Sequence, residues 1–189
     1  MNKNFRSFIS ALNSLHPITQ AAANAIQQYS TESHYHRGEI LHGQEIHQLY
    51  FINKGVLRGF IPGDHKDITT WMSCEDELIL FSGAPSNDPG SQEMIEVLED
   101  CTLITLSSKD LTHLSNEYND ICQITKNIFL RHCNELNNRL SIIKQSNAEE
   151  KYNLFLQHYS HLANRVFLKY ISSFLGITPE TLSRVRARR

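Results

Sequence analysis

The last 26 residues of the chain carry the pattern that most restricts how it can fold. Two short apolar stretches flank Gly176, and glycine tolerates the positive φ that a tight turn between two helices needs. The residues at the positions where the two helices would touch are apolar or small: Ile171, Ser172, Leu175, Ile177, Leu182 and Val185. Residues 164–189 therefore predict two short helices packed at a steep angle, as in a helix-turn-helix.

The second predicted helix has clear start signals and a polar outer side. Thr178 is a candidate N-cap, and Pro179 takes the first helical position, where its missing N–H is not needed. Glu180 could accept a hydrogen bond from cytosine N4, and Arg184 could donate two to guanine O6 and N7. The residues predicted to contact duplex DNA are Thr178, Glu180, Thr181, Ser183, Arg184, Arg186, Arg188 and Arg189.

Positive charge is concentrated in the same segment. Residues 164–189 hold six basic side chains and one acid, a net charge of +5; the whole chain has −2, so the other 163 residues have −7. Basic side chains bind duplex DNA by releasing condensed counterions from its phosphates. The alternative is an amphipathic C-terminal helix whose basic face is only solvated. The turn glycine and its apolar flanks favour the helix-turn-helix.

Composition excludes several classes of protein. The chain has no run of 18 apolar residues, and its first ten residues lack an apolar segment, so neither a membrane span nor a secretory signal is predicted and a cytoplasmic location is expected. No nucleophile has a recognisable partner and no glycine-rich phosphate loop occurs, so an enzyme is not expected. The cysteines are far apart and form no CxxC pair, which predicts reduced thiols: Cys74, Cys101, Cys122 and Cys133.

The first 106 residues change from a helical pattern to a strand pattern. Apolar spacing over residues 5–29 predicts two short helices divided by Pro17. From Thr31, short apolar or alternating runs are separated by turn residues. The predicted strands cover residues 39–41, 48–53, 56–61, 67–72, 78–81, 94–98 and 103–106. Short strands at this spacing predict a small antiparallel barrel or jelly roll.

Helical patterns return after Ser107. Ser108 is a candidate cap for a short helix, and a longer helix is predicted from about Tyr118 to Lys144. One apolar stripe on the longer helix has heptad spacing and is the predicted dimer seam: Phe129, Cys133, Leu136, Leu140 and Ile143. A second stripe could rest on the strands: Ile121, Ile124 and Ile128. Alternatively, both stripes pack within one chain; DNA readers usually need two half-sites, which favours a dimer.

Residues 145–147 are predicted to form a hinge, and residues 148–162 a further helix. The apolar side of that helix should form the floor beneath the helix-turn-helix: Tyr152, Phe155, Tyr159 and Leu162. The expected fold class is α+β, an antiparallel, jelly-roll-like β-roll flanked by helices, with a long dimerisation helix and a small all-α helix-turn-helix domain. The expected boundaries are 1–117, 118–147 and 148–189.

This order of elements resembles the Crp–Fnr family of transcription regulators from end to end. Thr-Pro-Glu-Thr-Leu-Ser-Arg at 178–184 resembles the family's recognition-helix signature, in which a Glu and an Arg four residues apart read base edges. Arg-Gly-Glu at 37–39 and Tyr-Phe-Ile-Asn-Lys-Gly at 50–55 resemble its opening strands and glycine turn. The resemblance implies a homodimer on an inverted repeat of double-stranded DNA, with RNA polymerase as a further partner.

The chain departs from the members of that family that bind cyclic nucleotides. Their Gly-Glu-Leu and Arg-Ser/Thr-Ala segments hold the ribose and phosphate, whereas residues 76–78 here are Asp-Glu-Leu and residues 91–93 are Ser-Gln-Glu. Between Lys66 and Lys109 there is no Lys, Arg or His but nine acids, so a buried phosphate would lack a countercharge. A degenerate effector domain that does not bind cyclic AMP is expected, with no cofactor.

Two further family features are not expected. The sequence ends at Arg189, in or just after the recognition helix, so the phosphate contacts of a β-hairpin wing are not expected. The N-terminal cysteine cluster that holds an iron–sulfur cluster in oxygen-sensing members is not found in this sequence either.

Two alternatives to a ligand-free regulator remain open. The same scaffold could sense a neutral or apolar small ligand in its β-roll. The candidate pocket residues are Trp71, Met72, Glu77, Leu78, Phe81, Gln92 and Met94. A cupin-like metal protein is the alternative of a different class, because His34, His36 and Glu39 faintly resemble a His-x-His…Glu motif. Their spacing does not fit that motif, so no metal site is predicted.

Overall fold

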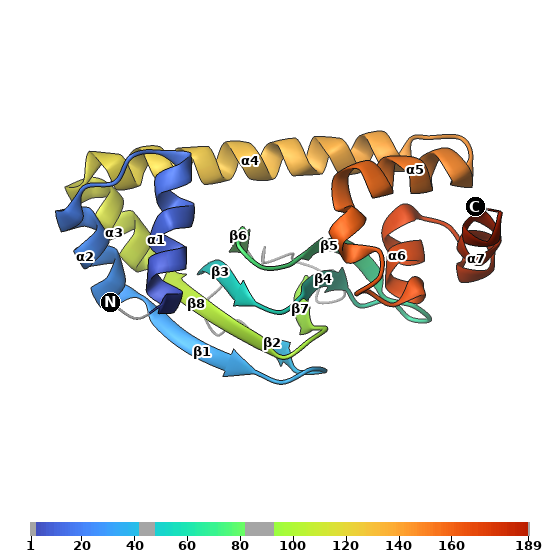
Figure 1. The fold of residues 1–189 in the computed structure, drawn as a ribbon, viewed down its shortest axis with the longest axis horizontal. Helices are drawn as coiled ribbons and strands as arrows, with labels where there is room; N and C mark the ends of the chain where they lie inside the picture. Colours follow the sequence, from blue (N-terminus) through green and yellow to red (C-terminus); the bar gives the residue numbers. More distant parts are fainter. Residues whose placement is uncertain (1–2, 42–47, 82–92, 189) are drawn as a thin grey trace.

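The computed structural model describes residues 3–41, 48–81 and 93–188 of the chain. Three helices lie at one end of a central β-structure, α4 runs along one side of it, and α5 to α7 lie at the other end (Figure 1). The helices are α1 (Lys3–Leu15), α2 (Gln20–Tyr29), α3 (Ser108–Glu117), α4 (Asn119–Ile143), α5 (Ala148–Tyr159), the 3₁₀ helix η2 (Ser160–Leu162), α6 (Leu168–Leu175) and α7 (Pro179–Ala187). The predicted order of helices is confirmed.

Two four-stranded antiparallel sheets form the β-structure. The strands are β1 (Thr31–Tyr35), β2 (Ile40–Leu41), β3 (Gln48–Lys54), β4 (Leu57–Ile61), β5 (Ile68–Ser73), β6 (Leu78–Phe81), β7 (Met94–Val97) and β8 (Cys101–Ser107). One sheet has the order β1-β8-β3-β6 and the other β2-β7-β4-β5. Most neighbouring strands are distant in sequence, so this is the jelly-roll-like β-roll that the sequence predicts.

The central strand β3 is packed on both faces. Leu49 and Phe51 contact the N-terminal helices and α4, whereas Tyr50 and Ile52 contact the second sheet. Successive side chains of a strand point to opposite faces, so four consecutive apolar residues can be buried only between two layers. The sheet that contains β3 therefore lies between the second sheet and the helices.

Strand β1 is not predicted by the sequence pattern. Thr31 to Tyr35 pair with Cys101 to Thr105 of β8 in antiparallel register. The β1 sequence, Thr-Glu-Ser-His-Tyr, has no buried residue, and β1 is an edge strand with one neighbour. Backbone pairing rather than apolar burial forms this strand, so hydrophobic periodicity could not predict it.

Local capping explains where the helices begin. Thr19 caps α2 by accepting a hydrogen bond from the Ala22 N–H, and its own N–H donates to Asp120 Oδ2 at 2.7 Å. The start of α2 is thus tied to the start of α4. Ser107, not Ser108 as predicted, caps α3 by accepting from the Asp110 N–H, so the helix begins one residue earlier than expected.

The two apolar stripes of α4 have different environments. The stripe of Ile121, Ile124 and Ile128 is buried, at 2% exposure or less, against α1, α3 and the first sheet, as predicted. The predicted seam residues Phe129, Leu136 and Leu140 are about half exposed. In the described part of the chain, no helix is both long and apolar enough to cross a membrane.

Gly55 offers a test of the turn between β3 and β4. Its φ is +102°, and a Cβ there would lie 2.8 Å from the Asp100 carbonyl oxygen and overlap Cys101 Sγ. We expect Gly55→Ala to lower the free energy of unfolding by about 2–4 kcal/mol, measured by urea denaturation, through both backbone strain and overpacking.

Gly38→Ala is the matched control for Gly55→Ala. Gly38 also has a positive φ, +91°, but a Cβ there would meet nothing within 4 Å. Strain alone should cost about 1–2 kcal/mol at this position. Equal losses in the two variants would contradict the close approach of Gly55 to β8.

Candidate nucleic-acid interface

The turn between α6 and α7 has the geometry of a helix-turn-helix. Gly176 ends α6 in the left-handed region, with φ 64° and ψ 40°. Its N–H donates to Ser173 O, and the Ile177 N–H donates to Ser172 O at 3.0 Å. Lys151 Nζ from α5 donates to Leu175 O at 3.2 Å. Three of the last four carbonyl groups of α6, those of Ser172, Ser173 and Leu175, therefore accept hydrogen bonds, which fixes the direction in which α7 leaves.

The start of α7 follows the predicted capping pattern. Thr178 Oγ1 accepts a hydrogen bond from the Thr181 N–H at 3.2 Å, and Pro179 is the first helical residue. Hydrogen bonds to the Glu180 carboxylate from its own N–H and from Thr178 lower the pKa of Glu180. Glu180 is therefore an ionised hydrogen-bond acceptor near neutral pH.

The inner side of α7 packs on α5 and α6. Leu182 is fully buried, and it belongs to one apolar cluster with Phe155 of α5 and Ile171 of α6. The predicted floor of the helix-turn-helix is confirmed, with stacked or edge-on rings from Tyr152, Phe155, Tyr159 and Phe174. The helices α5 to α7 and η2 are here called the C-terminal helical unit (residues 148–188). Its apolar cluster fixes the inner side of α7 against α5 and α6.

The other side of α7 is exposed at one end of the molecule (Figure 1). We call its exposed residues the outer face of α7: Glu180, Ser183, Arg184, Ala187 and Arg188. Thr181 is half-buried between this face and the core. Glu180 and Arg184 are four residues apart, so both project from one side of the helix. Arg189 lies outside the described residues.

Arg186 is not part of this face, contrary to the prediction. Its Nη2 donates to Ala163 O at 2.8 Å, and its guanidinium lies 5.3 Å from the Tyr152 ring centre. Its Nε is buried without a hydrogen-bond partner among the described residues. The sequence shows only that position 186 carries a charge; the packing of α7 on α5 turns that charge inward.

Arg165, a second basic residue of the segment 164–189, holds the C-terminal helical unit on the β-roll. The Arg165 guanidinium donates to Glu75 at 2.6 and 2.8 Å and to Glu99 at 2.7 and 3.1 Å. Hydrogen bonds from Arg165 lower the pKa of Glu75 to about 2, and the two carboxylates raise the pKa of Arg165. The net charge of +5 thus overstates the positive charge available to a nucleic acid.

Arg58 of β4 also links the β-roll to the C-terminal helical unit, a contact that the sequence does not predict. It is 2% exposed and pairs with Glu96 and with Asp67 at 2.9 Å. Its guanidinium lies 3.8 Å from the ring centre of Tyr170 in α6, and the Tyr170 hydroxyl donates to Glu96 at 3.0 Å. A single arginine in a predicted strand gives no signal for such a contact, because its partners come from distant segments.

A small cavity lies between the β-roll, α4 and the C-terminal helical unit. Its volume is about 190 Å³, and four predicted pocket residues line it: Trp71, Met72, Glu77 and Leu78. Met94 does not line it. Nothing is described of the Phe81 side chain, and Gln92 lies outside the described residues.

The cavity also corrects the expectation of a cation-free pocket. Arg139 and His132 of α4 and His158 of α5 line it. Arg139 Nη2 donates to Thr69 O at 2.9 Å, and burial lowers the pKa of Arg139. The strands that line the cavity, β5 and β6, contain no Lys, Arg or His, as predicted for residues 67–108, but the helices that close the cavity supply basic residues.

The histidine pair considered as a cupin motif is not assembled. His34 Nδ1 lies 3.0 Å from Thr102 Oγ1, and His36 pairs with Asp100 at 3.7 Å. Glu39 is not grouped with them. Within the described residues, the set that could hold a metal ion is Cys74, Glu77 and His161.

No protein-family model and no curated protein matches the sequence. Solved structures match most of its length. FixK2 from Bradyrhizobium japonicum has a TM-score of 0.72 and 15% identity, covering 84% of this chain and 83% of that one. A Eubacterium rectale structure, described as that of a regulator of the Crp/Fnr family, has a TM-score of 0.68 and 16% identity over 90% and 83%.

The chain has the Crp/Fnr fold. CooA from Carboxydothermus hydrogenoformans, solved as a double mutant, matches with a TM-score of 0.68 and 14% identity over 86% of this chain and 77% of that one. The resemblance noted from the sequence and the expected fold class are confirmed at the level of the fold. In this chain, α7 lies at one end of the molecule and the β-roll in the middle (Figure 1).

The Arg165 ion pairs should hold the C-terminal helical unit against the β-roll. We expect Arg165→Ala to weaken this docking by about 1 kcal/mol, a modest value because these side chains are about one third exposed. Hydrogen exchange of α6 and α7 should accelerate about fivefold, while α1 and α2 should not change. Lys169→Ala is the control, because Lys169 is exposed and its contact is the Tyr170 ring. Equal rates of hydrogen exchange in α6 and α7 of both variants would show that the Arg165 ion pairs do not hold the C-terminal helical unit against the β-roll.

Proposed function

We propose that the chain is a dimeric, sequence-specific DNA-binding regulator of transcription and not an enzyme. The observation that carries this proposal is the outer face of α7. On the inner side of α7, Leu182 and Arg186 pack against the C-terminal helical unit. On the outer face, Glu180, Arg184 and Arg188 remain exposed. A short helix held in this way matches how a recognition helix enters the major groove.

The side chains of the outer face suit different parts of a duplex. Arg184 can donate two hydrogen bonds to guanine O6 and N7, and the ionised Glu180 can accept one from cytosine N4. Arg188, Ser183 and Thr178 can contact phosphates, which set the register of the helix on the duplex. Arg186 positions α7 and does not contact DNA in this proposal.

The exposed seam of α4 supports dimerisation. Phe129 and Leu140 are 56% and 52% exposed, and Leu136 and Ile143 are exposed as well. Cys133 is half-buried between them. An apolar heptad stripe of this length gains free energy when a second copy covers it. The dimer would carry two α7 helices to successive major grooves about 34 Å apart and read an inverted repeat.

The three predicted parts would then have separate tasks. Residues 1–117 form a degenerate effector domain, residues 118–147 the dimerisation helix and hinge, and residues 148–189 the DNA-binding domain. FixK2, CooA and the Eubacterium rectale regulator support this division through their common fold. The dimer would act in the cytoplasm on promoters that RNA polymerase uses.

Base-reading and phosphate-binding variants should differ in kind. Glu180→Ala and Arg184→Ala should each lose about 1–3 kcal/mol of discrimination between matched and mismatched operators. Arg188→Ala should weaken binding to all duplexes alike and reduce the salt dependence. Fluorescence anisotropy on matched and mismatched duplexes measures both effects. Identical behaviour of the three variants would contradict the proposed reading by α7.

The α4 seam should control self-association. Leu140→Glu would place a charge within the apolar seam, so we expect self-association to weaken at least about tenfold in analytical ultracentrifugation. Asn134→Glu is the control, because Asn134 is exposed on α4 but lies off the seam. Unchanged self-association in Leu140→Glu would show that this stripe is not the dimer interface.

Cyclic AMP should not bind. The described cavity of about 190 Å³ is smaller than the roughly 300–1,000 Å³ of ordinary ligand pockets. Its single arginine, Arg139, donates to Thr69 O through Nη2, and its Nε is buried without a hydrogen-bond partner among the described residues. Isothermal titration should show no heat of binding, and micromolar binding would contradict a degenerate effector domain.

The second candidate function, sensing of a small neutral ligand, is favoured by the apolar side of this cavity, formed by Trp71, Met72 and Leu78.

A further inference from the structure

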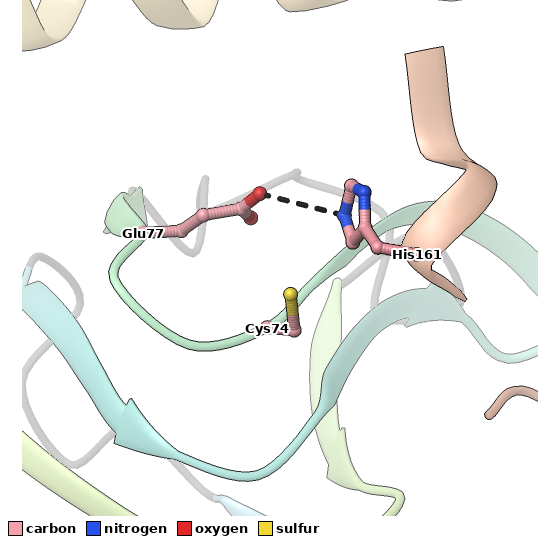
Figure 2. A group of neighbouring side chains, drawn as sticks. All are labelled: Cys74, Glu77 and His161. Carbon is pink, nitrogen blue, oxygen red and sulfur yellow. Dashed lines mark ion pairs between the residues drawn. The ribbon is translucent and has the colours of Figure 1, made fainter. Parts of the chain in front are cut away.

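We propose that Cys74, Glu77 and His161 form a binding site for one transition metal ion of the Zn²⁺ class. The thiol sulfur, a carboxylate oxygen and an imidazole nitrogen all lie within 4.8 Å of one another. Glu77 and His161 point toward each other, and the Cys74 sulfur points into the space between them (Figure 2). Thiolate, imidazole and carboxylate are the donor groups that Zn²⁺ takes from proteins.

The distance between two of the donors is close to that in an occupied zinc site, and all three donors lie within 4.8 Å of one another. A tetrahedral zinc site with bonds of about 2.0–2.3 Å places its ligand atoms about 3.3–3.8 Å apart. Glu77 Oε1 and His161 Nε2 are already 3.9 Å apart. Small side-chain rotations would bring the three donors to an ion, and the fourth position would be left for water.

The backbone holds two of the donors in place. Cys74 and Glu77 lie on the turn between β5 and β6, where Asp76 has a left-handed φ of 64°. The Asp76 N–H donates to Ile52 O at 2.9 Å, and the Ile52 N–H donates to Glu77 O at 3.1 Å. A non-glycine residue in this conformation costs free energy, so the turn is held by its contacts and the donors are preorganised.

The third donor comes from the C-terminal helical unit. His161 lies in η2, beside the fully buried Leu162. The His161 side chain is 44% exposed and the Glu77 side chain is 39% exposed, so an ion can enter from solvent. The bound ion would join the β-roll to the helical unit at the same boundary as the Arg165 ion pairs.

The charge around the site favours a cation. The carboxylates of Glu75 and Glu77 both lie near the Cys74 thiol. A divalent ion bound at Cys74 would replace the thiol proton and offset part of this local negative charge.

Cobalt provides a direct test, because Co²⁺ takes zinc sites and reports its ligands. Full-length protein, treated with EDTA and carrying no histidine tag, is titrated with Co²⁺. We expect one equivalent to give the sulfur-to-cobalt charge-transfer band and the visible bands of tetrahedral coordination, and Zn²⁺ to abolish both. Cys74→Ser should remove the charge-transfer band. His161→Ala and Glu77→Gln should weaken Co²⁺ binding at least about tenfold.

Matched variants separate the site from other thiols and imidazoles. Cys133→Ser and His158→Ala leave the three proposed ligands intact and should not change the spectra. His161→Ala alters an exposed side chain, so it tests the site even if Cys74→Ser fails to fold. The proposal is overturned if no stoichiometric Co²⁺ band appears, or if the band in His161→Ala equals that of the unaltered protein.

The effect of the ion on DNA binding rests on the proposed function, whereas metal binding does not. Zn²⁺ should change the affinity for duplex DNA in the unaltered protein and leave it unchanged in His161→Ala. Equal shifts in both proteins would overturn the coupling between the metal site and α7. A protein that binds Co²⁺ stoichiometrically but no duplex would retain the metal site and lose the proposed function.

Discussion

The buried guanidinium of Arg58 is shared by the β-roll and the C-terminal helical unit, and the placement of α7 depends on it. Arg58 pairs with Glu96 and Asp67 in the β-roll and stacks on the Tyr170 ring of α6. Removing one partner of a buried ion pair costs several kcal/mol, because the remaining charge stays uncompensated. The hydroxyl of Ser173 adds to this docking by accepting from the Thr69 N–H at 3.0 Å. The β-roll therefore acts as the support that orients α6, and α6 orients α7.

The same opposite charges that hold the two parts together decide which arginines can meet DNA. Glu75 and Glu99 engage Arg165, and the core of the helical unit engages Arg186. Arg184 and Arg188 remain exposed on the outer face of α7. A net charge computed over the segment cannot separate these two groups, although only the second can release counterions from phosphates. The proposed metal site would add one more connection at the boundary where Arg165 already acts.

Local signals were the part of the fold and site that the sequence could predict. Gly176, Thr178 and Pro179 specify a helix end and a helix start within a few residues, and the structure has both where they were expected. The inward turn of Arg186 and the entry of Arg139 into the cavity depend on helices that approach from distant parts of the chain. Propensity and periodicity carry no information on such approaches. The polar edge strand β1 escaped prediction for the same reason, because its partner β8 begins 66 residues after β1 ends.

Selection of bound sequences from a random pool of duplexes tests the central claim most directly. If α7 reads bases as part of a dimer, the unaltered protein should enrich an inverted repeat whose half-sites are one helical turn, about 34 Å, apart. Each half-site should contain a guanine for Arg184 and a cytosine for Glu180. A pool that stays random after repeated selection, although the protein is folded and binds duplex at low salt, would contradict the account.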